Sequence, residues 1–297
     1  MNSIRNAPAP WHEGERALHA RAGVADRLAE AGTAILRDHM PAQHQALFAE
    51  LPLLYAGTLD AEGQPWASVL AGPPGFAHAR TPRLLRVEAQ PLAGDAAAGN
   101  FSAGAPIGVL GLQAQTRRRN RLNGWIAESD ALGFTVEAGQ SFGNCPRFIQ
   151  PRDLRHAPAA GEPSVRMLPA LDAAALRLVR EADTFFIASA HPEARRSRDP
   201  AAGVDVSHRG GPAGFVQLDA RGLLLVPDYA GNTFFNTLGN LLLEPRCGLL
   251  FVDFASGERL QLAARAELRW DTGARSLRLE VLRAVHSTGG LPLRLAG

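Results

Sequence analysis

Hydrophobic positions along the chain recur with two different spacings. Between residues 11 and 50 the spacing is helical: apolar residues from Val24 to Leu36 recur near every third or fourth position, and Pro41 suits the first turn of another helix. From Leu53 onward the apolar runs are short and are broken by Gly, Pro and Asp, which is typical of antiparallel strands. One further amphipathic helix is predicted over 171–183.

The second half of the chain repeats the first. The segment GPPGFAHARTPRLLRV, which begins at Gly72, aligns with GPAGFVQLDARGLLLV, which begins at Gly211, and the same offset still holds at Pro106 and Pro245. A period this long indicates two modules and not a solenoid, whose repeats are much shorter. An antiparallel module of about 100 residues closes best as a small barrel, because closure removes exposed strand edges.

The pattern therefore predicts a mainly β chain with small helices and two tandem β-barrel modules. We expect an N-terminal helical extension over residues 1–40, a first module over 41–155, a linker over 156–170 and a second module over 171–297.

The chain contains no lysine, so all 31 of its basic residues are arginine. This composition excludes a pyridoxal phosphate Schiff base, a Walker A loop and a lysine general base. A bound phosphate would instead be held by arginine, hydroxyl, side-chain amide or backbone N–H groups. The formal net charge is only +2 and the arginines are spread along the chain, so no nucleic-acid partner is expected.

The sequence predicts a cytoplasmic protein with no membrane partner. No apolar run reaches the roughly 18 residues of a membrane span, and the first residues lack the apolar stretch of a secretion signal. The two cysteines, Cys145 and Cys247, are far apart in the sequence and suit a reducing compartment. The histidines show no metal-ligand spacing, so no metal is expected either.

The densest group of polar residues lies in the second half, in PDYAGNTFFNTLGNLLLEP (227–245). Its glycines let the backbone approach a ligand, and its Asn and Thr side chains can hydrogen-bond a phosphate. Just upstream, Ser207, Arg209 and Gly210 stand at a strand end, where a guanidinium can clamp a phosphate. Both segments also fit ordinary turns that bond only to themselves, and composition favours that simpler interpretation.

The first half carries a basic cluster of four arginines, Arg117, Arg118, Arg119 and Arg121. Successive side chains of a strand point to opposite faces, so Arg117 and Arg119 would share one face and Arg118 would lie on the other. Such a cluster can bind phosphate, and it is equally common in a solvated turn.

A second motif in the first half is Gly139-Gln140-Ser141-Phe142-Gly143, which fits the G-x-S-x-G pattern of serine hydrolases. That mechanism needs a turn between a strand and a long helix in a parallel sheet. Pro146 and Pro151 permit at most a short turn after the motif, so a hydrolase with Ser141 as nucleophile is disfavoured.

Several of these segments resemble the pyridoxamine 5′-phosphate oxidase-related FMN-binding proteins, and the resemblance covers most of the chain from Trp11 onward. The segments that carry it are GQPWASVLAG (63–72), GPPGF (72–76), TRRRNRLNG (116–124), SFGNCPRFIQ (141–150), VDVSHRGG (204–211), PDYAGNTFFNTLGNLLLEPRCGLLFVDF (227–254) and RLQLAARAE (259–267). The resemblance implies the FMN-binding split barrel, an antiparallel Greek-key barrel with small helices. Such barrels typically pair and hold FMN in the cleft between them.

The resemblance also implies which residues bind the cofactor. It places the SHRGG strand end beside the flavin, the GNTFFNTLGN segment near the phosphate, and a glutamine on a later strand as a weaker ring contact. The implied cofactor-binding residues are Ser207, Arg209, Gly210, Asn232, Asn236, Thr237, Asn240 and Gln261. It assigns no catalytic residue, and the lysine that the true oxidases place at phosphate and substrate is absent from this chain.

We therefore expect an FMN-dependent oxidoreductase whose small-molecule substrate or electron donor the sequence does not name. The alternative is a non-catalytic module that binds a flavin or another cofactor, or that only dimerises. The first module lacks the Asn-Thr pair in its matching segment, GDAAAGNFSAG (94–104), and is expected to be structural. The modules can pair within one chain or between chains; a homodimer is expected, because an open apolar barrel face favours association.

Overall fold

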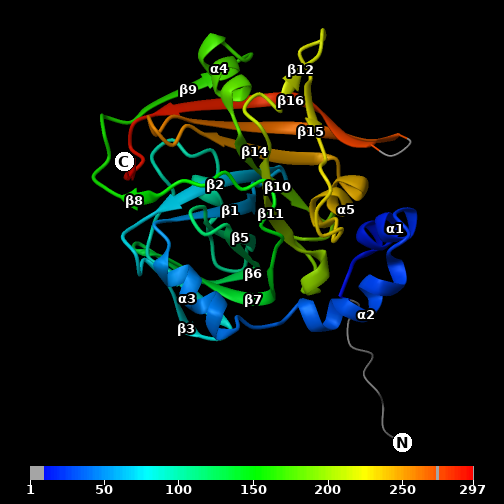
Figure 1. Ribbon diagram of the computed structural model, residues 1–297. Coiled ribbons are helices and arrows are strands. Elements are labelled where there is room, and N and C mark those ends of the chain that lie inside the picture. Colours follow the sequence, from blue (N-terminus) through cyan, green and yellow to red (C-terminus); the bar gives the residue numbers. More distant parts are fainter. Residues whose placement is uncertain (1–9, 272–273, 297) are drawn as a thin grey trace, which may run out of the picture.

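The computed structural model describes residues 10–271 and 274–296, and three small helices begin the described chain (Figure 1). They are α1 (Glu13–Arg21), α2 (Ala25–Ile35) and α3 (Ala42–Glu50). The helix predicted from Val24 to Leu36 is α2. The start of the predicted helical extension, residues 1–9, lies outside the described residues.

A first antiparallel sheet has seven strands in the order β2-β1-β5-β6-β7-β4-β3. The strands are β1 (Leu53–Leu59), β2 (Pro65–Ala71), β3 (Ala77–Thr81), β4 (Leu84–Val87), β5 (Pro106–Gln113), β6 (Arg118–Asp130) and β7 (Gly133–Gly143), with the 3-10 turn η1 (Ala98–Asn100) between β4 and β5.

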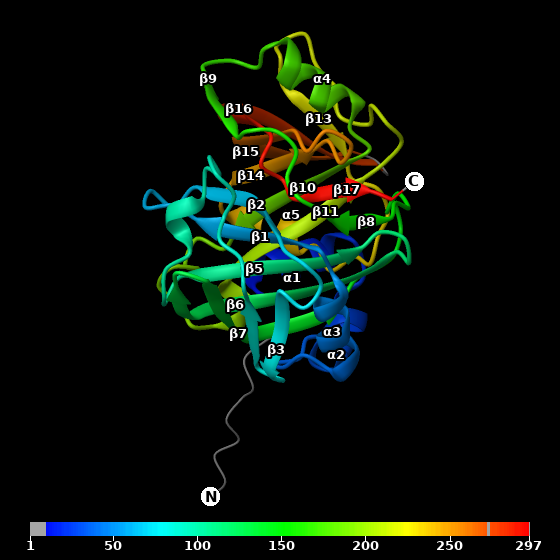
Figure 2. The same ribbon diagram turned by 90° about the vertical axis from the view of Figure 1, so that its left-hand side faces the viewer.

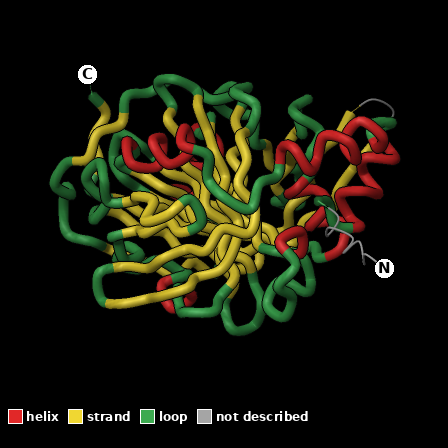
Figure 3. The backbone as a smooth tube through the Cα atoms, turned by 90° about the horizontal axis from the view of Figure 1, so that it is seen from below, coloured by secondary structure: helices red, strands yellow, loops and turns green. Residues whose placement is uncertain are grey.

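A second antiparallel sheet has the order β11-β10-β14-β15-β16-β13-β12, which is the first order with each strand replaced by its counterpart. Its elements are α4 (Ala173–Glu181), β10 (Thr184–Ala190), η2 (Pro200–Ala202), β11 (Val204–Gly210), β12 (Gln217–Leu218), β13 (Leu224–Pro227), α5 (Asn236–Leu243), β14 (Arg246–Val252), β15 (Arg259–Asp271) and β16 (Ala274–Thr288). The predicted mainly β, antiparallel architecture with small helices is confirmed, and the helices lie around the outside of the strands (Figure 3).

The segment between the sheets, predicted as a linker over 156–170, contains β9 (Ser164–Leu168), which pairs with β16. Just before it, β8 (Leu154–His156) pairs with β17 (Leu293–Leu295) near the end of the chain. These strands are only three to five residues long and largely exposed, so the sequence pattern does not distinguish β8 and β9 from a linker. No helix in the described ranges is long and apolar enough to cross a membrane.

The two sheets pack against each other within the one chain (Figures 1 and 2). Each sheet has its own apolar core, and a third core is shared between them. In the shared core the ring of Tyr55 from β1 stacks on the ring of Phe186 from β10, with ring centroids 3.5 Å apart. Pairing of the modules within the chain is thus what the structure shows, and a homodimer of whole chains stays a prediction.

Two glycines allow the edge strands to cross closely between the sheets. The strand β2 contacts β14 of the other sheet, and β11 contacts β5. A Cβ on Gly248 of β14 would lie 2.4 Å from the carbonyl oxygen of Pro65, and one on Gly108 of β5 would lie 2.8 Å from that of Val204. Because real Cβ atoms do not approach backbone so closely, only glycine permits these two crossings.

We expect Gly248→Ala to destabilise the protein, because the added Cβ would force the two sheets apart. Overpacking of this kind costs about 1–3 kcal/mol, and urea denaturation would show it as a lower midpoint at an unchanged m value. The matched control is Gly99→Ala, since a Cβ there meets no atom within 4 Å. Equal midpoints for the two variants would contradict the close crossing.

Candidate functional site

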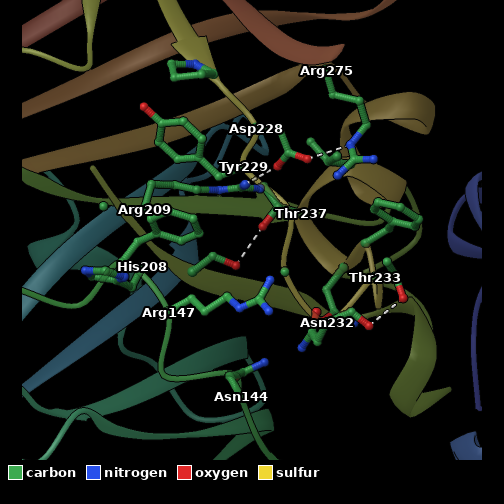
Figure 4. Close-up of a pocket in the computed structure, with 18 of the residues that line it drawn as sticks. Asn144, Arg147, His208, Arg209, Asp228, Tyr229, Asn232, Thr233, Thr237 and Arg275 are labelled. Atoms are coloured by element: carbon green, nitrogen blue, oxygen red, sulfur yellow. Dashed lines mark hydrogen bonds and ion pairs between the residues drawn. The ribbon is translucent and has the colours of Figure 1, made fainter. Parts of the chain in front are cut away.

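A pocket of about 110 Å³ lies where the two sheets meet beside α5 (Figure 4). The first sheet contributes residues of β6 and of the loop after β7. The second sheet contributes the end of β11, the loop between β13 and α5, the first turn of α5, and the start of β16.

Six of the eight cofactor residues expected from the sequence line this pocket: Ser207, Arg209, Gly210, Asn232, Asn236 and Thr237. The structure does not bring the other two to it. Asn240 is a buried residue of α5 itself and donates from Nδ2 to Ser189 Oγ at 3.2 Å. Gln261 is buried at a different contact between the sheets, where it donates to the carbonyl oxygen of Ala67 at 2.9 Å.

A hydroxyl pair and a guanidinium form the floor of the pocket. Ser207 Oγ and Thr237 Oγ1 lie 2.6 Å apart, and Arg121 donates from Nη2 to Ser207 Oγ at 2.5 Å. Arg121 also forms a buried ion pair with Asp205, with Nη1 2.7 Å from Oδ1. A nearly dry Arg–Asp pair holds its geometry firmly, because removing either partner would leave a buried charge unpaired. Ser207 Oγ in turn donates to Asp205 Oδ2 at 3.0 Å, so these groups hold one another in place.

A second ion-pair group forms the opposite wall. Asp228 accepts from Arg209 through Oδ1 and from Arg275 through Oδ2, the latter at 2.7 Å (Figure 4). The single carboxylate is thus shared by two guanidinium groups. One positive charge of this wall has no carboxylate of its own.

Arg119 is a partly buried cation of the pocket without a carboxylate partner among the described residues. Its Nη1 donates to Nδ1 of the buried His208 at 3.0 Å, its Nε is buried without a hydrogen-bond partner, and no described carboxylate lies within ion-pair distance. Burial, together with the nearby charges of Arg121 and Arg209, lowers the pKa of Arg119 to about 9. Burial and Arg119 also hold the pKa of His208 well below its ordinary value, so this ring is neutral and can accept the bond.

The pocket carries more positive than negative charge. Its charged lining residues are Arg119, Arg121, Arg147, Arg209, Arg275 and Asp228. Even when Asp205 beneath the floor is included, the guanidinium groups outnumber the carboxylates. A recess with this excess of cations favours an anionic ligand.

Backbone strain is concentrated at the same place. Phe148, Thr233 and Phe235 have φ values of 63°, 62° and 59°, in the left-handed region that residues with side chains rarely adopt, and all three line the pocket. Gly210 faces this strained segment: a Cβ on it would lie 2.1 Å from the carbonyl oxygen of Phe148. Strain of about 1–3 kcal/mol per residue persists where surrounding structure enforces it, commonly at ligand sites.

Aromatic surface is also available at the pocket. The rings of Phe148 and Tyr229 stack with centroids 4.8 Å apart and planes inclined by 21°. Phe148 is 41% exposed, which is unusual for a large apolar side chain. The pair offers a flat surface to a planar ligand.

The helix α1 closes the pocket from behind. Its residue Glu15 is 4% exposed, completes the helix cap by accepting from the backbone N–H of His12, and accepts from Asn236 Nδ2 at 2.6 Å. Burial raises the pKa of Glu15 to about 8, against the opposing effect of these two donors. The contact is close, since a Cβ on Gly14 would lie 2.3 Å from the carbonyl oxygen of Gly239 in α5.

Sequence reasoning left some of these residues undecided. The arginine cluster of the first half was open between a phosphate site and a solvated turn, and the structure separates its members. Arg119 and Arg121 line the pocket from one face of β6, whereas Arg117 and Arg118 are exposed. The roles of Glu15 and Arg275 had no sequence signal, because both act through contacts with residues far along the chain.

The serine hydrolase alternative is wrong. Ser141 is fully buried within the strand β7 and not on a strand-to-helix turn. Its Oγ lies 2.9 Å from Nδ1 of His44, which is also buried. A nucleophile must reach its substrate, and this hydroxyl cannot.

One group of possible metal ligands occurs in the described residues, formed by His12, Glu13 and His191. The Nδ1 atom of each histidine accepts a backbone N–H, from Gly14 and Glu193 respectively, at 3.1 Å. A neutral ring that accepts at Nδ1 carries its proton on Nε2. The nitrogens that face one another therefore have no lone pair to offer a metal.

No protein-family model matches the sequence, and no match was found among curated proteins. Among solved structures, the chain is similar to a FAD-binding protein from Mesorhizobium loti, with 13% identity, coverage of 41% of this chain and 96% of that one, and a TM-score of 0.29. It is also similar to HutZ, a heme storage protein from Vibrio cholerae, with 13% identity, the same coverage of 41% and 96%, and a TM-score of 0.28. Likenesses this distant carry no functional argument, so the interpretation of the pocket rests on its own residues.

The burial of Glu15 predicts how stability depends on pH. A carboxyl group whose pKa rises on folding from 4.5 to about 8 contributes stability that is fully present below the lower value and is lost as the pH rises through the higher one. We expect Glu15→Gln, which cannot ionise, to remove part of the fall in unfolding free energy over this interval. Urea denaturation at a series of pH values measures that fall.

The control for this measurement is Glu30→Gln, because Glu30 is an exposed carboxylate on the neighbouring helix α2. It should leave the pH dependence as it is in the unsubstituted protein. Parallel curves for Glu15→Gln and the unsubstituted protein would show that Glu15 does not hold its proton in the folded state.

Proposed function

We propose that the pocket binds FMN and that the chain is an FMN-dependent oxidoreductase acting on an unidentified small molecule. The observation that carries the proposal is the unneutralised guanidinium of Arg119 in a recess already rich in arginine. A phosphate monoester supplies the two negative charges and the acceptor oxygens that such a recess lacks.

The floor of the pocket fits the phosphate end of the cofactor. Ser207 and Thr237 offer hydroxyl groups, and the backbone N–H groups of the first turn of α5, at Asn236 and Thr237, carry the partial positive charge of a helix N-terminus. Arg119 and Arg121 lie on the facing strand of the other sheet. Hydroxyl, backbone N–H and guanidinium groups are the phosphate donors available to a chain that has no lysine.

The volume of the pocket sets how much of the cofactor it encloses. At about 110 Å³ it is smaller than the roughly 300–1,000 Å³ of sites that enclose a whole ligand. The closed part therefore fits the phosphate and its neighbouring atoms, and the flavin ring is left to the open side. The stacked rings of Phe148 and Tyr229 offer a planar surface there.

A bound flavin supplies the redox chemistry, and the protein binds and orients it. In this proposal the side chains of the pocket hold and orient the phosphate. None of them is positioned as an essential acid or base: His208 is engaged by Arg119, and Glu15 lies behind Asn236.

We expect the protein to bind FMN more tightly than riboflavin, which lacks the phosphate. Arg119→Met should weaken FMN binding about 10- to 100-fold, the effect of losing a charge-assisted hydrogen bond, and should leave riboflavin binding unchanged. Quenching of flavin fluorescence measures both affinities. The matched control is Arg118→Met, because Arg118 is exposed on the same strand. Equal affinities for FMN and riboflavin would overturn the phosphate assignment.

The oxidoreductase activity needs a separate measurement on the FMN-loaded protein. We expect NADH or NADPH to bleach the flavin absorbance at about 450 nm, and oxygen or another acceptor to restore it. A flavin that stays bound but is reduced by neither donor would favour the alternative, a cofactor-binding module without catalysis.

A further inference from the structure

The duplicated sheet order creates a counterpart of the pocket on the other side of the molecule. Ser207 is the fourth residue of a seven-residue strand and pairs with Ile187, and Ser68 is the fourth residue of β2 and pairs with Ala56. The two serines therefore occupy equivalent positions.

Arg121 and Gln261 are equivalent in the same way. Arg121 pairs with Leu110, the fifth residue of β5, and Gln261 pairs with Leu250, the fifth residue of β14. In the pocket, Arg121 of the first sheet faces Ser207 of the second. At the counterpart, Gln261 of the second sheet faces the strand of the first sheet that carries Ser68.

An aspartate of the protein itself occupies the counterpart. Asp95 Oδ1 accepts from Ser68 Oγ at 2.7 Å, from Gln261 Nε2 at 3.0 Å and from the backbone N–H of Ala97 at 2.8 Å. Burial raises the pKa of Asp95, and the three hydrogen bonds and the positive charge of Arg259, the strand equivalent of Arg119, oppose that rise by favouring the ionised carboxylate. A hydroxyl, an amide, a backbone N–H and a guanidinium are thus arranged around one anion.

Two equivalent asparagines, one in each half, show which residue stands at the position of Asp95 in the second half. Asn100 donates to Thr58 and Asn240 donates to Ser189, each acceptor being the sixth residue of its strand. Five residues before these asparagines stand Asp95 and Phe235, respectively. Phe235 therefore stands at the chain position of Asp95, and in the pocket the carboxylate that bonds Ser207 and Arg121 comes instead from Asp205 of β11.

We propose that the Asp95 carboxylate is an internal anion that fills the counterpart of the pocket, and that removing it creates a binding site for a small carboxylate such as formate or acetate. Ser68 is held by β2, and Gln261 and Arg259 are held by β15, whereas the N–H of Ala97 belongs to the same turn as Asp95. The statement that Asp95 occupies the position of a cofactor phosphate rests on the proposed function. The statement that Asp95 fills an anion site does not. A filled counterpart leaves one cofactor site per chain.

The test is chemical rescue of Asp95→Ala. We expect the variant to have a lower Tm than the unsubstituted protein, and added sodium formate or acetate to raise that Tm saturably by about 2–4 °C over sodium chloride at equal ionic strength. Asp95→Asn fills the space without the charge and should show no such increase, as should the unsubstituted protein. A Tm of Asp95→Ala that formate, acetate and chloride change equally would overturn the proposal.

A second measurement uses the unsubstituted protein and does not depend on a variant that folds. Equilibrium dialysis against saturating FMN should give one FMN per chain. Two per chain would mean that the counterpart is open, and would overturn the proposal. No bound FMN would count against the proposed function and leave the rescue experiment to decide the anion site.

Discussion

The structure depends on the close crossing of edge strands between the two sheets. Gly248 lies against Pro65 and Gly108 lies against Val204, with no room for a side chain at either glycine. Because the backbones meet this closely, residues on the strands beside them are brought within hydrogen-bond distance across the boundary. Arg121 reaches Ser207 and Gln261 reaches Ala67 for this reason. Each crossing creates one place at which side chains of both sheets converge.

The two convergent places have the same strand frame and different electrostatics. On one side, guanidinium groups exceed the described carboxylates, and the backbone of the surrounding loops includes left-handed residues such as Thr233. On the other side, a neutral glutamine replaces the arginine, and Asp95 supplies an anion from within the chain. The difference arises from a few side chains and not from topology, because the strand order is identical.

The sequence predicts the parts of this arrangement that depend on local order. The antiparallel texture and the polar block at 227–245 follow from neighbouring residues, and that block does line the pocket. Arg121 was undecided because its partner Ser207 is 86 residues away. The family resemblance places Gln261 with the pocket residues, whereas strand register carries it to the opposite crossing. The strand β9 cannot be predicted locally, because this short exposed segment becomes a strand only by pairing with the distant β16.

The two crossings also differ in how their charges affect the stability of the fold. Like charges and left-handed residues raise the free energy of the pocket, and the pairs of Asp205 with Arg121 and of Asp228 with Arg275 hold its walls in place. A multiply charged anion would relieve the repulsion on entering, so its binding and the stability of the fold are coupled. On the other side the anion is the side chain of Asp95, which is part of the chain, so no ligand is needed to supply a negative charge there. One crossing can therefore stabilise the shared frame, whereas we propose that the other binds a ligand.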